Sequence, residues 1–424
     1  MLIGPSATHF PHVRRSLMES GLSTKPNRLE PKAWVVLLVS GIYGGADALC
    51  GLFVSVYLWV NSLDFGVVCA HYLALYVVTP FFFLLSGWYA QARDRLHVYR
   101  LGLAMHAVYY GALLVLRERA PDFAPHLGAF LGVTWGVYFS GANTFNYDMT
   151  MKGRREYFFG AMHSVIGISR LLAPPIGGFI IFLAPGDLLG YQIVFGLVVC
   201  MYIVCFMLSF QIPSDNERRP FRIRRALFPP REHRDWRLIM LASSTMAGAY
   251  SIFGFLLGLL MFIETENELS VGGFGSFQAI AGIVTAYIAG RIVTQRTWKR
   301  SMQIAVITLV SAGLSIVTHL SVTTLIIFGF LRSVAGPLFA IPHASLRFDT
   351  ISRTVDDPAE RIEYLCAWEV PLAIGRIIMM LTVMSLYLNF PDNNLGIRLG
   401  LFLLCSVRIA TYLIIRRTSP LQGQ

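Results

Sequence analysis

The sequence predicts an all-α membrane protein with twelve transmembrane helices in two pseudo-symmetric six-helix bundles. Three observations predict this fold: the apolar composition, the recurrence of long apolar runs, and the one-sided distribution of basic residues. The chain of 424 residues is 55% hydrophobic and only 14% charged, whereas soluble proteins carry about 25% charged residues. A chain with so little polar surface is expected to lie in a lipid bilayer.

Apolar runs long enough to cross a bilayer recur along the whole chain. A transmembrane helix needs about 20 mainly apolar residues, and twelve segments meet this requirement: 34–60, 66–90, 98–116, 126–147, 156–183, 190–211, 237–263, 271–293, 301–319, 321–346, 362–389 and 394–415. They predict five regions: a cytoplasmic tail (1–33), an N-terminal bundle (34–211), a linker (212–236), a C-terminal bundle (237–415) and a second cytoplasmic tail (416–424).

Basic residues distinguish the two sides of the predicted bundles. Lys and Arg outside the spans fall in the tails and in the loops on the N-terminal side, except for Arg117 and Arg119. The positive-inside rule therefore supports the helix count and places both termini in the cytoplasm, with the protein in the inner or plasma membrane. The net charge of +11 is interpreted as contact with anionic lipid, above all through the 212–236 linker, and not with nucleic acid.

The chain lacks the motifs of enzymes and ATP-driven pumps. Its six cysteines lie in apolar stretches without metal-ligand spacing, so they are interpreted as small buried residues. No glycine-rich loop ends in Lys-Ser or Lys-Thr, as a phosphate-binding loop would. We therefore expect no enzymatic activity, no metal and no cofactor.

The two halves of the chain resemble each other. A shift of 203 residues aligns Gly87 with Gly290, and a shift of 206 aligns Arg170 with Arg376. Both halves begin on the same side of the membrane, so the sequence predicts parallel repeats related by an axis along the membrane normal.

The segment from Gly87 to Arg95 lies at the end of the second predicted span and reads Gly-Trp-Tyr-Ala-Gln-Ala-Arg-Asp-Arg. It resembles the gating motif Gly-x-x-x-Asp-Arg-x-Gly-Arg-Arg of the major facilitator superfamily, whose members are twelve-helix secondary transporters, with Gln91 at the acidic position and Asp94 three residues later. The resemblance implies a gating role for Gly87, Asp94 and Arg95. Asp148 and Asp349, which end the fourth and tenth predicted spans, are expected to form salt bridges of an inner gate.

The fifth predicted span resembles the family's antiporter motif, Gly-x8-Gly-x3-Gly-Pro-x2-Gly-Gly. The matching positions hold Gly160, Ser169, Ala173, Pro174, Gly177 and Gly178. In the family this motif accompanies proton-driven export. The alternative is a packing role, because small residues permit close helix contact and proline bends a helix.

Ionisable residues inside the predicted spans are the main site candidates, since each costs about 2.5–3.5 kcal/mol near the bilayer centre. The five acidic and basic candidates are Asp47, Arg170, Arg332, Glu369 and Arg376. The acids are predicted proton acceptors, and the arginines are predicted partners or ligands of a substrate anion. The alternative is permanent ion pairing that locks helices together.

His163 aligns with Glu369 in the repeat and is a further candidate for proton transfer. The residues and the resemblance together predict a secondary transporter of a small organic solute, acting as a monomer by alternating access, with export driven by protons. Uptake or exchange of an organic anion is a second hypothesis, because three arginines face two acids. A transporter-like receptor or assembly protein that moves no solute is a third.

Overall fold

The computed structural model describes residues 31–149, 155–186, 188–212, 221, 223–355, 360–390 and 395–422. Within these residues there is no β-strand, and eleven segments are long and apolar enough to cross a membrane. One of these segments, Arg95–Ala142, has 48 residues and holds two helices joined by a short 3-10 helix. The predicted all-helical membrane fold is therefore confirmed, whereas the count of twelve spans stays a prediction.

The first half of the chain forms the helices α2 (Pro31–Gly51), α3 (Phe53–Ser62), α4 (Phe65–Ala92), α5 (Arg95–Leu116), η1 (Arg117–Phe123), α6 (Ala124–Met149), α7 (Arg155–Leu183) and α8 (Leu189–Ser209). The first predicted span is thus two helices, because the helix is interrupted at Leu52 between α2 and α3.

The second half forms the helices α9 (Arg224–Leu227), α10 (Arg234–Thr265), α11 (Glu268–Ile292), η2 (Gln295–Thr297), α12 (Trp298–Thr318), α13 (Val322–Thr354), α14 (Arg361–Ala367), α15 (Glu369–Asn389), α16 (Leu395–Ile415) and α17 (Ser419–Gln422). Helix α13 continues eight residues beyond the predicted end at 346. Asp349 therefore lies within a helix and not at its end, contrary to the prediction.

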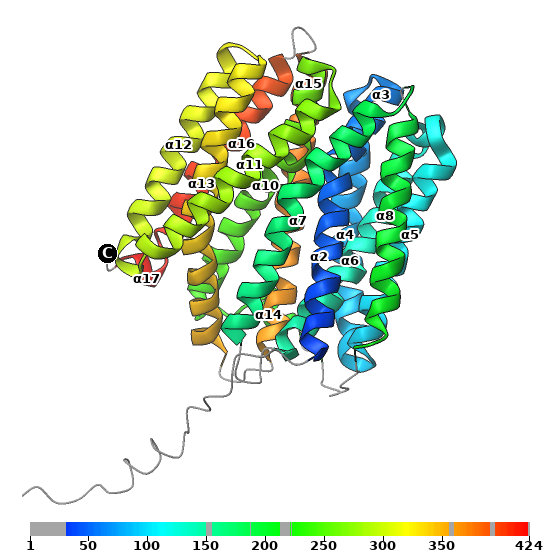
Figure 1. Ribbon diagram of the computed structural model, residues 1–424. Coiled ribbons are helices and arrows are strands. Elements are labelled where there is room, and N and C mark those ends of the chain that lie inside the picture. Colours follow the sequence, from blue (N-terminus) through cyan, green and yellow to red (C-terminus); the bar gives the residue numbers. More distant parts are fainter. Residues whose placement is uncertain are drawn as a thin grey trace, which may run out of the picture.

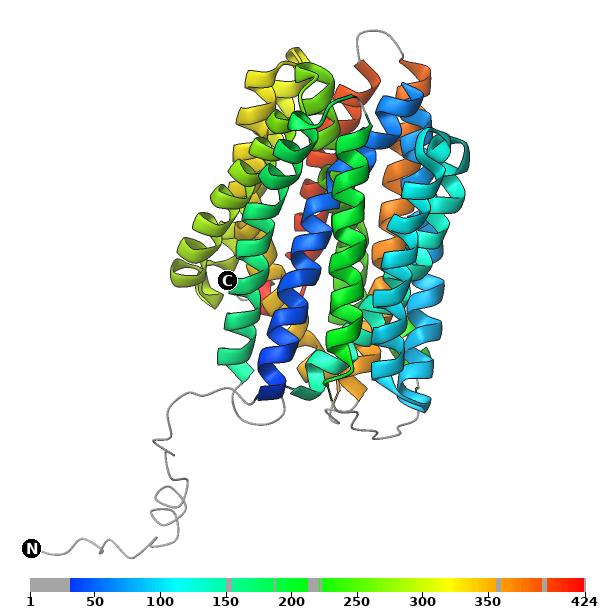
Figure 2. The same cartoon turned by 45° about the vertical axis from the view of Figure 1, so that its right-hand side comes forward.

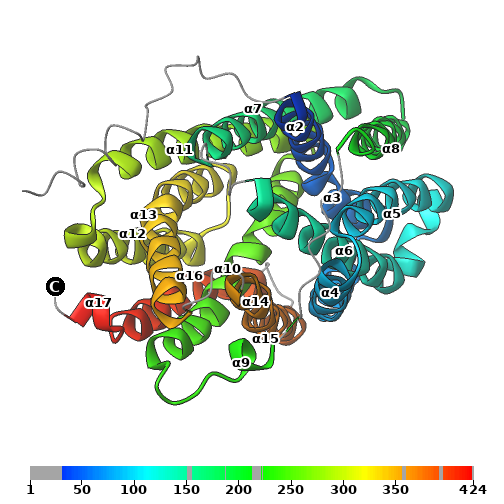
Figure 3. The ribbon, with the colours of Figure 1, turned by 90° about the horizontal axis from the view of Figure 1, so that it is seen from below.

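The helices of each half pack mainly against one another (Figure 1). Seen along the helix axes, α2–α6 and α8 lie on one side and α10–α13 and α16 on the other (Figure 3). The two sides meet mainly through three helix pairs, α7 with α11, α4 with α15, and α3 with α10, and α4 also contacts α14.

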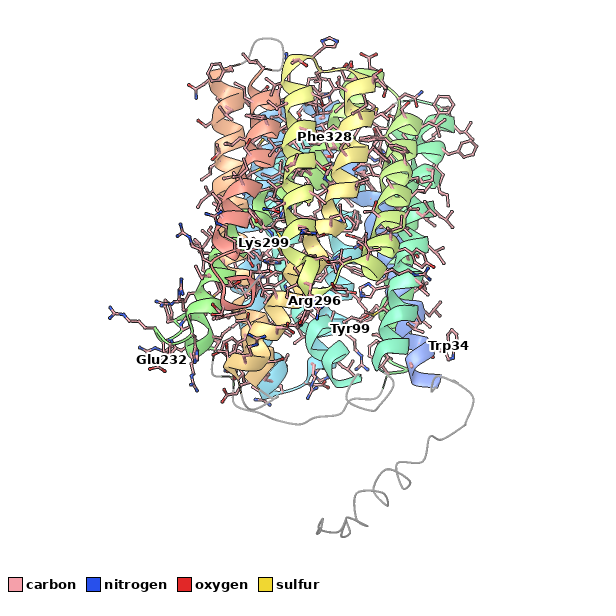
Figure 4. All side chains as sticks on the ribbon, turned by 90° about the vertical axis from the view of Figure 1, so that its left-hand side faces the viewer. Trp34, Tyr99, Glu232, Arg296, Lys299 and Phe328 are labelled. Carbon is pink, nitrogen blue, oxygen red and sulfur yellow. The ribbon has the colours of Figure 1, made fainter. Side chains whose placement is uncertain are left out.

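Most helices run between two opposite faces of the molecule (Figure 2). We call the face where α2 begins and α8 ends the terminal face, which is the lower end in Figure 1, and the opposite one the far face. Trp34, Tyr99 and Glu232 lie toward the terminal face, and Phe328 lies toward the far face (Figure 4).

Small residues bring the first helix of each half close to the fifth. On α2, a Cβ added at Gly45 would lie 3.7 Å from Cβ of Ser169 on α7. On α10, a Cβ added at Gly248 would lie 2.6 Å from the carbonyl oxygen of Gly375 on α15. The 206-residue shift aligns Ser169 with Gly375, so equivalent positions make equivalent contacts, which supports the predicted repeat.

The contact between α7 and α11 is closer still. A Cβ at Gly178 would overlap the carbonyl oxygen of Glu268, and a Cβ at Gly272 would overlap that of Pro174. Backbones approach this closely only where side chains are absent, and lipid supplies no hydrophobic force that would hold the helices together otherwise.

Gly272→Ala is expected to lower the free energy of unfolding by about 1–3 kcal/mol, because the added methyl group collides with the Pro174 backbone. The neighbouring Gly273 has open space around its Cβ position, so Gly273→Ala is the matched control and is expected to gain up to about 1 kcal/mol of helix stability. Thermal unfolding of the two variants in detergent checks this. Equal melting temperatures would contradict the contact.

Candidate functional site

Two charged residues of the first half face each other between α2 and α7. Nη2 of Arg170 lies 3.8 Å from Oδ2 of Asp47. The side chains are 57% and 32% exposed, respectively, so the pair is loose and accessible. Such a pair contributes little to stability, but it places an acidic and a basic side chain together inside a membrane-spanning region, where each alone would be costly.

The loose pair lies next to the contact that joins the two halves. Leu171 follows Arg170 directly, and its carbonyl oxygen accepts a hydrogen bond of 2.6 Å from Oγ of Ser276 on α11. One turn further along α7, the carbonyl of Pro174 meets Gly272. Arg170 therefore lies directly beside the point where α7 contacts α11 of the second half, so a change in its ion pair occurs next to this contact.

A second ion pair lies in the other half, on α15. Glu369 Oε1 and Arg376 Nη1 bind each other, and their side chains are only 14% and 16% exposed. Arg376 Nε also donates a hydrogen bond of 3.1 Å to Oγ of Ser251 on α10. Glu369 and Arg376 are two turns apart on one helix. Glu369 therefore holds the arginine from α15, and the hydrogen bond to Ser251 holds it against α10.

Arg332 on α13 has a neutral partner. Its Nη1 donates a hydrogen bond of 2.9 Å to Oε1 of Gln278 on α11, and its guanidinium carbon lies 5.3 Å from the ring centroid of Phe253. The described residues show no carboxylate paired with it. The five predicted charges thus form two ion pairs and one arginine whose charge is not neutralised.

The motif on α7 forms helix contacts along its length. Ser169 lies against Gly45 of α2, and Gly177 lies against Phe53 of α3, whose ring is 2.8 Å from an added Cβ. Ala173 is buried. The described packing does not extend to Gly160. His163 is exposed on the same helix, two turns nearer the terminal face than Arg170.

The predicted gating residues lie near the terminal face. Gly87 on α4 is close to two helices, because an added Cβ would lie 3.3 Å from Ser140 Oγ on α6 and 3.7 Å from Cys366 Sγ on α14. Asp94 caps α5 by accepting a hydrogen bond of 2.8 Å from the backbone of Leu96. Arg95 is the first residue of α5 and is half-buried.

The structure shows no salt bridge for either of the two acids expected at the inner gate, within the residues it describes. The side chain of Asp148 lies outside the described residues. Asp349 forms no ion pair within the described part of the chain, and its neighbour Arg347 lies 3.7 Å from the ring centroid of Trp368. The gating role of both acids stays a prediction.

Sequence reasoning missed the neutral partners of the arginines, Ser251 and Gln278. A glutamine within an apolar span is itself a signal, because its amide needs a hydrogen-bond partner in lipid, and it would have pointed to Gln278. No such signal distinguishes Ser251 from other serines in the spans. Among the described residues, no cluster of His, Cys, Asp or Glu is placed to hold a metal ion.

Comparison with known proteins relates the chain to transporters. The sequence profile of the Major Facilitator Superfamily matches residues 36–345. The uncharacterized protein YqgE of Bacillus subtilis (strain 168) is 29% identical over 369 residues, which are 87% of this chain and 85% of that protein.

Solved structures share the fold at low sequence identity. The POT family transporter PepTSo superimposes with a TM-score of 0.74 at 10% identity, over 94% of this chain and 99% of its own. The human organic anion transporter MFSD10 (TETRAN) gives 0.61 at 14% identity, over 91% and 100%.

Arg376→Met is expected to lower the free energy of unfolding by about 3 kcal/mol, because it leaves the half-buried Glu369 carboxylate without its cation. The double variant Glu369→Gln/Arg376→Met is expected to recover most of this loss. Thermal unfolding in detergent measures both, with Arg291→Met, at an exposed position of α11, as the control. A double variant no more stable than Arg376→Met would contradict the pairing.

Proposed function

Because the chain belongs to the Major Facilitator Superfamily, we propose that it is a secondary active transporter that moves a small organic solute by alternating access, coupled to protons. Residues 36–345 match the family, and the fold is shared with transporters along nearly the whole chain. The termini are proposed to lie in the cytoplasm and the terminal face to be the cytoplasmic one, since it carries the basic loops.

The pair of Asp47 and Arg170 is the single observation that carries the proposed coupling. A proton on Asp47 removes its negative charge and releases Arg170, whose guanidinium then requires another anion or water. The adjacent Leu171 is hydrogen-bonded to Ser276 on α11. Protonation at Asp47 is thus proposed to bias the contact about which the two halves rock.

The structure is proposed to be the state open toward the terminal face. The contacts between α7 and α11 join Leu171, Pro174 and Gly178 to the far-face part of α11. His163 and Arg170, on the other part of α7, are exposed. On the far side, Tyr72 stacks on Phe255 with centroids 3.8 Å apart, which links α4 to α10.

Export is the proposed direction, on the strength of the motif in α7. Its residues Pro174 and Gly178 form the contact between the halves, so the motif lies where a proton-driven change of state has to act. Uptake or exchange of an organic anion is the second candidate. The uncompensated Arg332 favours it, and one structural relative is an organic anion transporter.

Asp47→Asn is expected to abolish proton-coupled flux while leaving the protein folded, because asparagine keeps the shape of the side chain but binds no proton. Solutes are first selected by thermal stabilisation of the purified protein across a library of metabolites and drugs. Proteoliposomes loaded with a pH-sensitive dye then report proton movement when a selected solute is added under an imposed pH gradient.

The control is Asp122→Asn, which removes one carboxylate at an exposed position in η1. It is expected to transport like the unmodified protein. Undiminished proton movement in Asp47→Asn would refute the coupling role. If no solute stabilises the protein or produces flux, a receptor or assembly protein becomes the better description.

A further inference from the structure

Arg332 and Arg408 lie within spans of the second half, and neither has an acidic partner among the described residues. Arg332 on α13 donates only to the neutral Gln278. Arg408 on α16 has a buried Nη1 atom without a hydrogen-bond partner. They differ in this from Arg170 and Arg376, each of which meets a carboxylate.

Arg332 and Arg408 belong to one cluster. Each is close enough to interact electrostatically with Tyr250 on α10, and Arg408 is repelled by Arg332. Aromatic rings lie beside both cations: the centroid of Phe253 is 5.3 Å from the guanidinium carbon of Arg332, and that of Phe339 is 5.2 Å from that of Arg408. The cluster therefore combines two positive charges with an apolar wall.

The cluster is accessible from one side. Tyr250 is 65% exposed, although Phe253 and Phe339 are buried. Its phenol can donate a hydrogen bond, and its ring is the part of the cluster that a ligand reaches first. The exposed tyrosine is therefore the accessible member of the cluster.

The energetics of the cluster call for an anion. A single uncompensated arginine in a transmembrane helix costs about 2.5–3.5 kcal/mol, and two neighbouring cations add mutual repulsion. Aromatic faces compensate each cation only in part. A carboxylate would neutralise one charge, bind the planar guanidinium in bidentate fashion, and use the free Nη1 of Arg408.

We propose that Arg332 and Arg408 bind the carboxylate group of the transported solute, with the Tyr250 hydroxyl as a further donor. The substrate class is then an organic carboxylate. This inference rests on the proposed transport function, which it makes more specific. It assigns a ligand role to Arg408, which the sequence alone does not single out.

Binding to the purified full-length chain tests the site, with two pairs of probes that share a shape and differ in charge. Benzoate is compared with benzamide, and hexanoate with hexanamide, by isothermal titration calorimetry. The unmodified protein is expected to bind at least one of the carboxylates and to bind it more tightly than its amide. Arg332→Gln and Arg408→Gln are each expected to weaken carboxylate binding about 10- to 100-fold, as the loss of a charge-assisted hydrogen bond predicts.

Arg291→Gln is the control, since it removes a positive charge from the same half at a position where the guanidinium lies over Tyr287, its neighbour one turn away. It is expected to bind the carboxylates normally. If Arg408→Gln does not fold, Arg408→Lys replaces it, because lysine keeps the charge and loses the bidentate geometry. Equal affinity for carboxylates and amides, no binding of either carboxylate, or unchanged binding in both variants would overturn the proposal.

The failure of this site and the failure of the transport function give different results. Binding of a carboxylate that depends on both arginines, without any flux of that carboxylate or of protons in proteoliposomes, would refute the transport function and leave the site intact. Proton-coupled flux of a neutral or cationic solute that is unchanged by Arg332→Gln and Arg408→Gln would refute the site and leave the transport function intact.

Discussion

Hydrocarbon does not solvate charge, and this constraint determines which helices of the protein meet. The backbone satisfies itself within helices, so the ionised side chains inside the spans decide the remaining polar contacts. Asp47 meets Arg170 between α2 and α7, and Arg376 reaches Ser251 between α15 and α10. By the predicted repeat, these are equivalent helix pairs. In each of them an arginine of the later helix, at positions that the repeat aligns, contacts the earlier helix.

The same helix pairs depend on small residues, because lipid gives helices no hydrophobic reason to associate. This explains how the motif on α7 tolerates Ser169 and Ala173 where the family pattern has glycine. The requirement is small size and not glycine itself, and Ser169 still packs beside Gly45. At Gly178, where the neighbour is the backbone of Glu268, glycine is retained.

Much of the fold could be predicted from the sequence, because the bilayer imposes length and hydropathy on each span. The prediction failed where the helix does not end with the membrane. Helix α13 continues to Thr354 through polar residues, since hydropathy marks the edge of the lipid and not the end of the hydrogen-bond ladder. For the site, charge alone identified Asp47 and Arg170, but not the pairing of each arginine. That choice depends on helix rotation and on neutral side chains such as Gln278, which periodicity does not resolve.

The two halves share a framework but differ in how their charges are matched, and this difference suggests a division of labour. In the first half, the accessible pair of Asp47 and Arg170 holds the acid that we propose as the proton acceptor. In the second half, Glu369 is held by Arg376, whereas Arg332 and Arg408 have no acidic partner in the described structure. A duplication that kept the helix contacts and changed the charges would let one half bind the proton and the other half bind the solute. Such a separation requires the halves to communicate, and the hydrogen bond between Leu171 and Ser276 joins them directly beside Arg170.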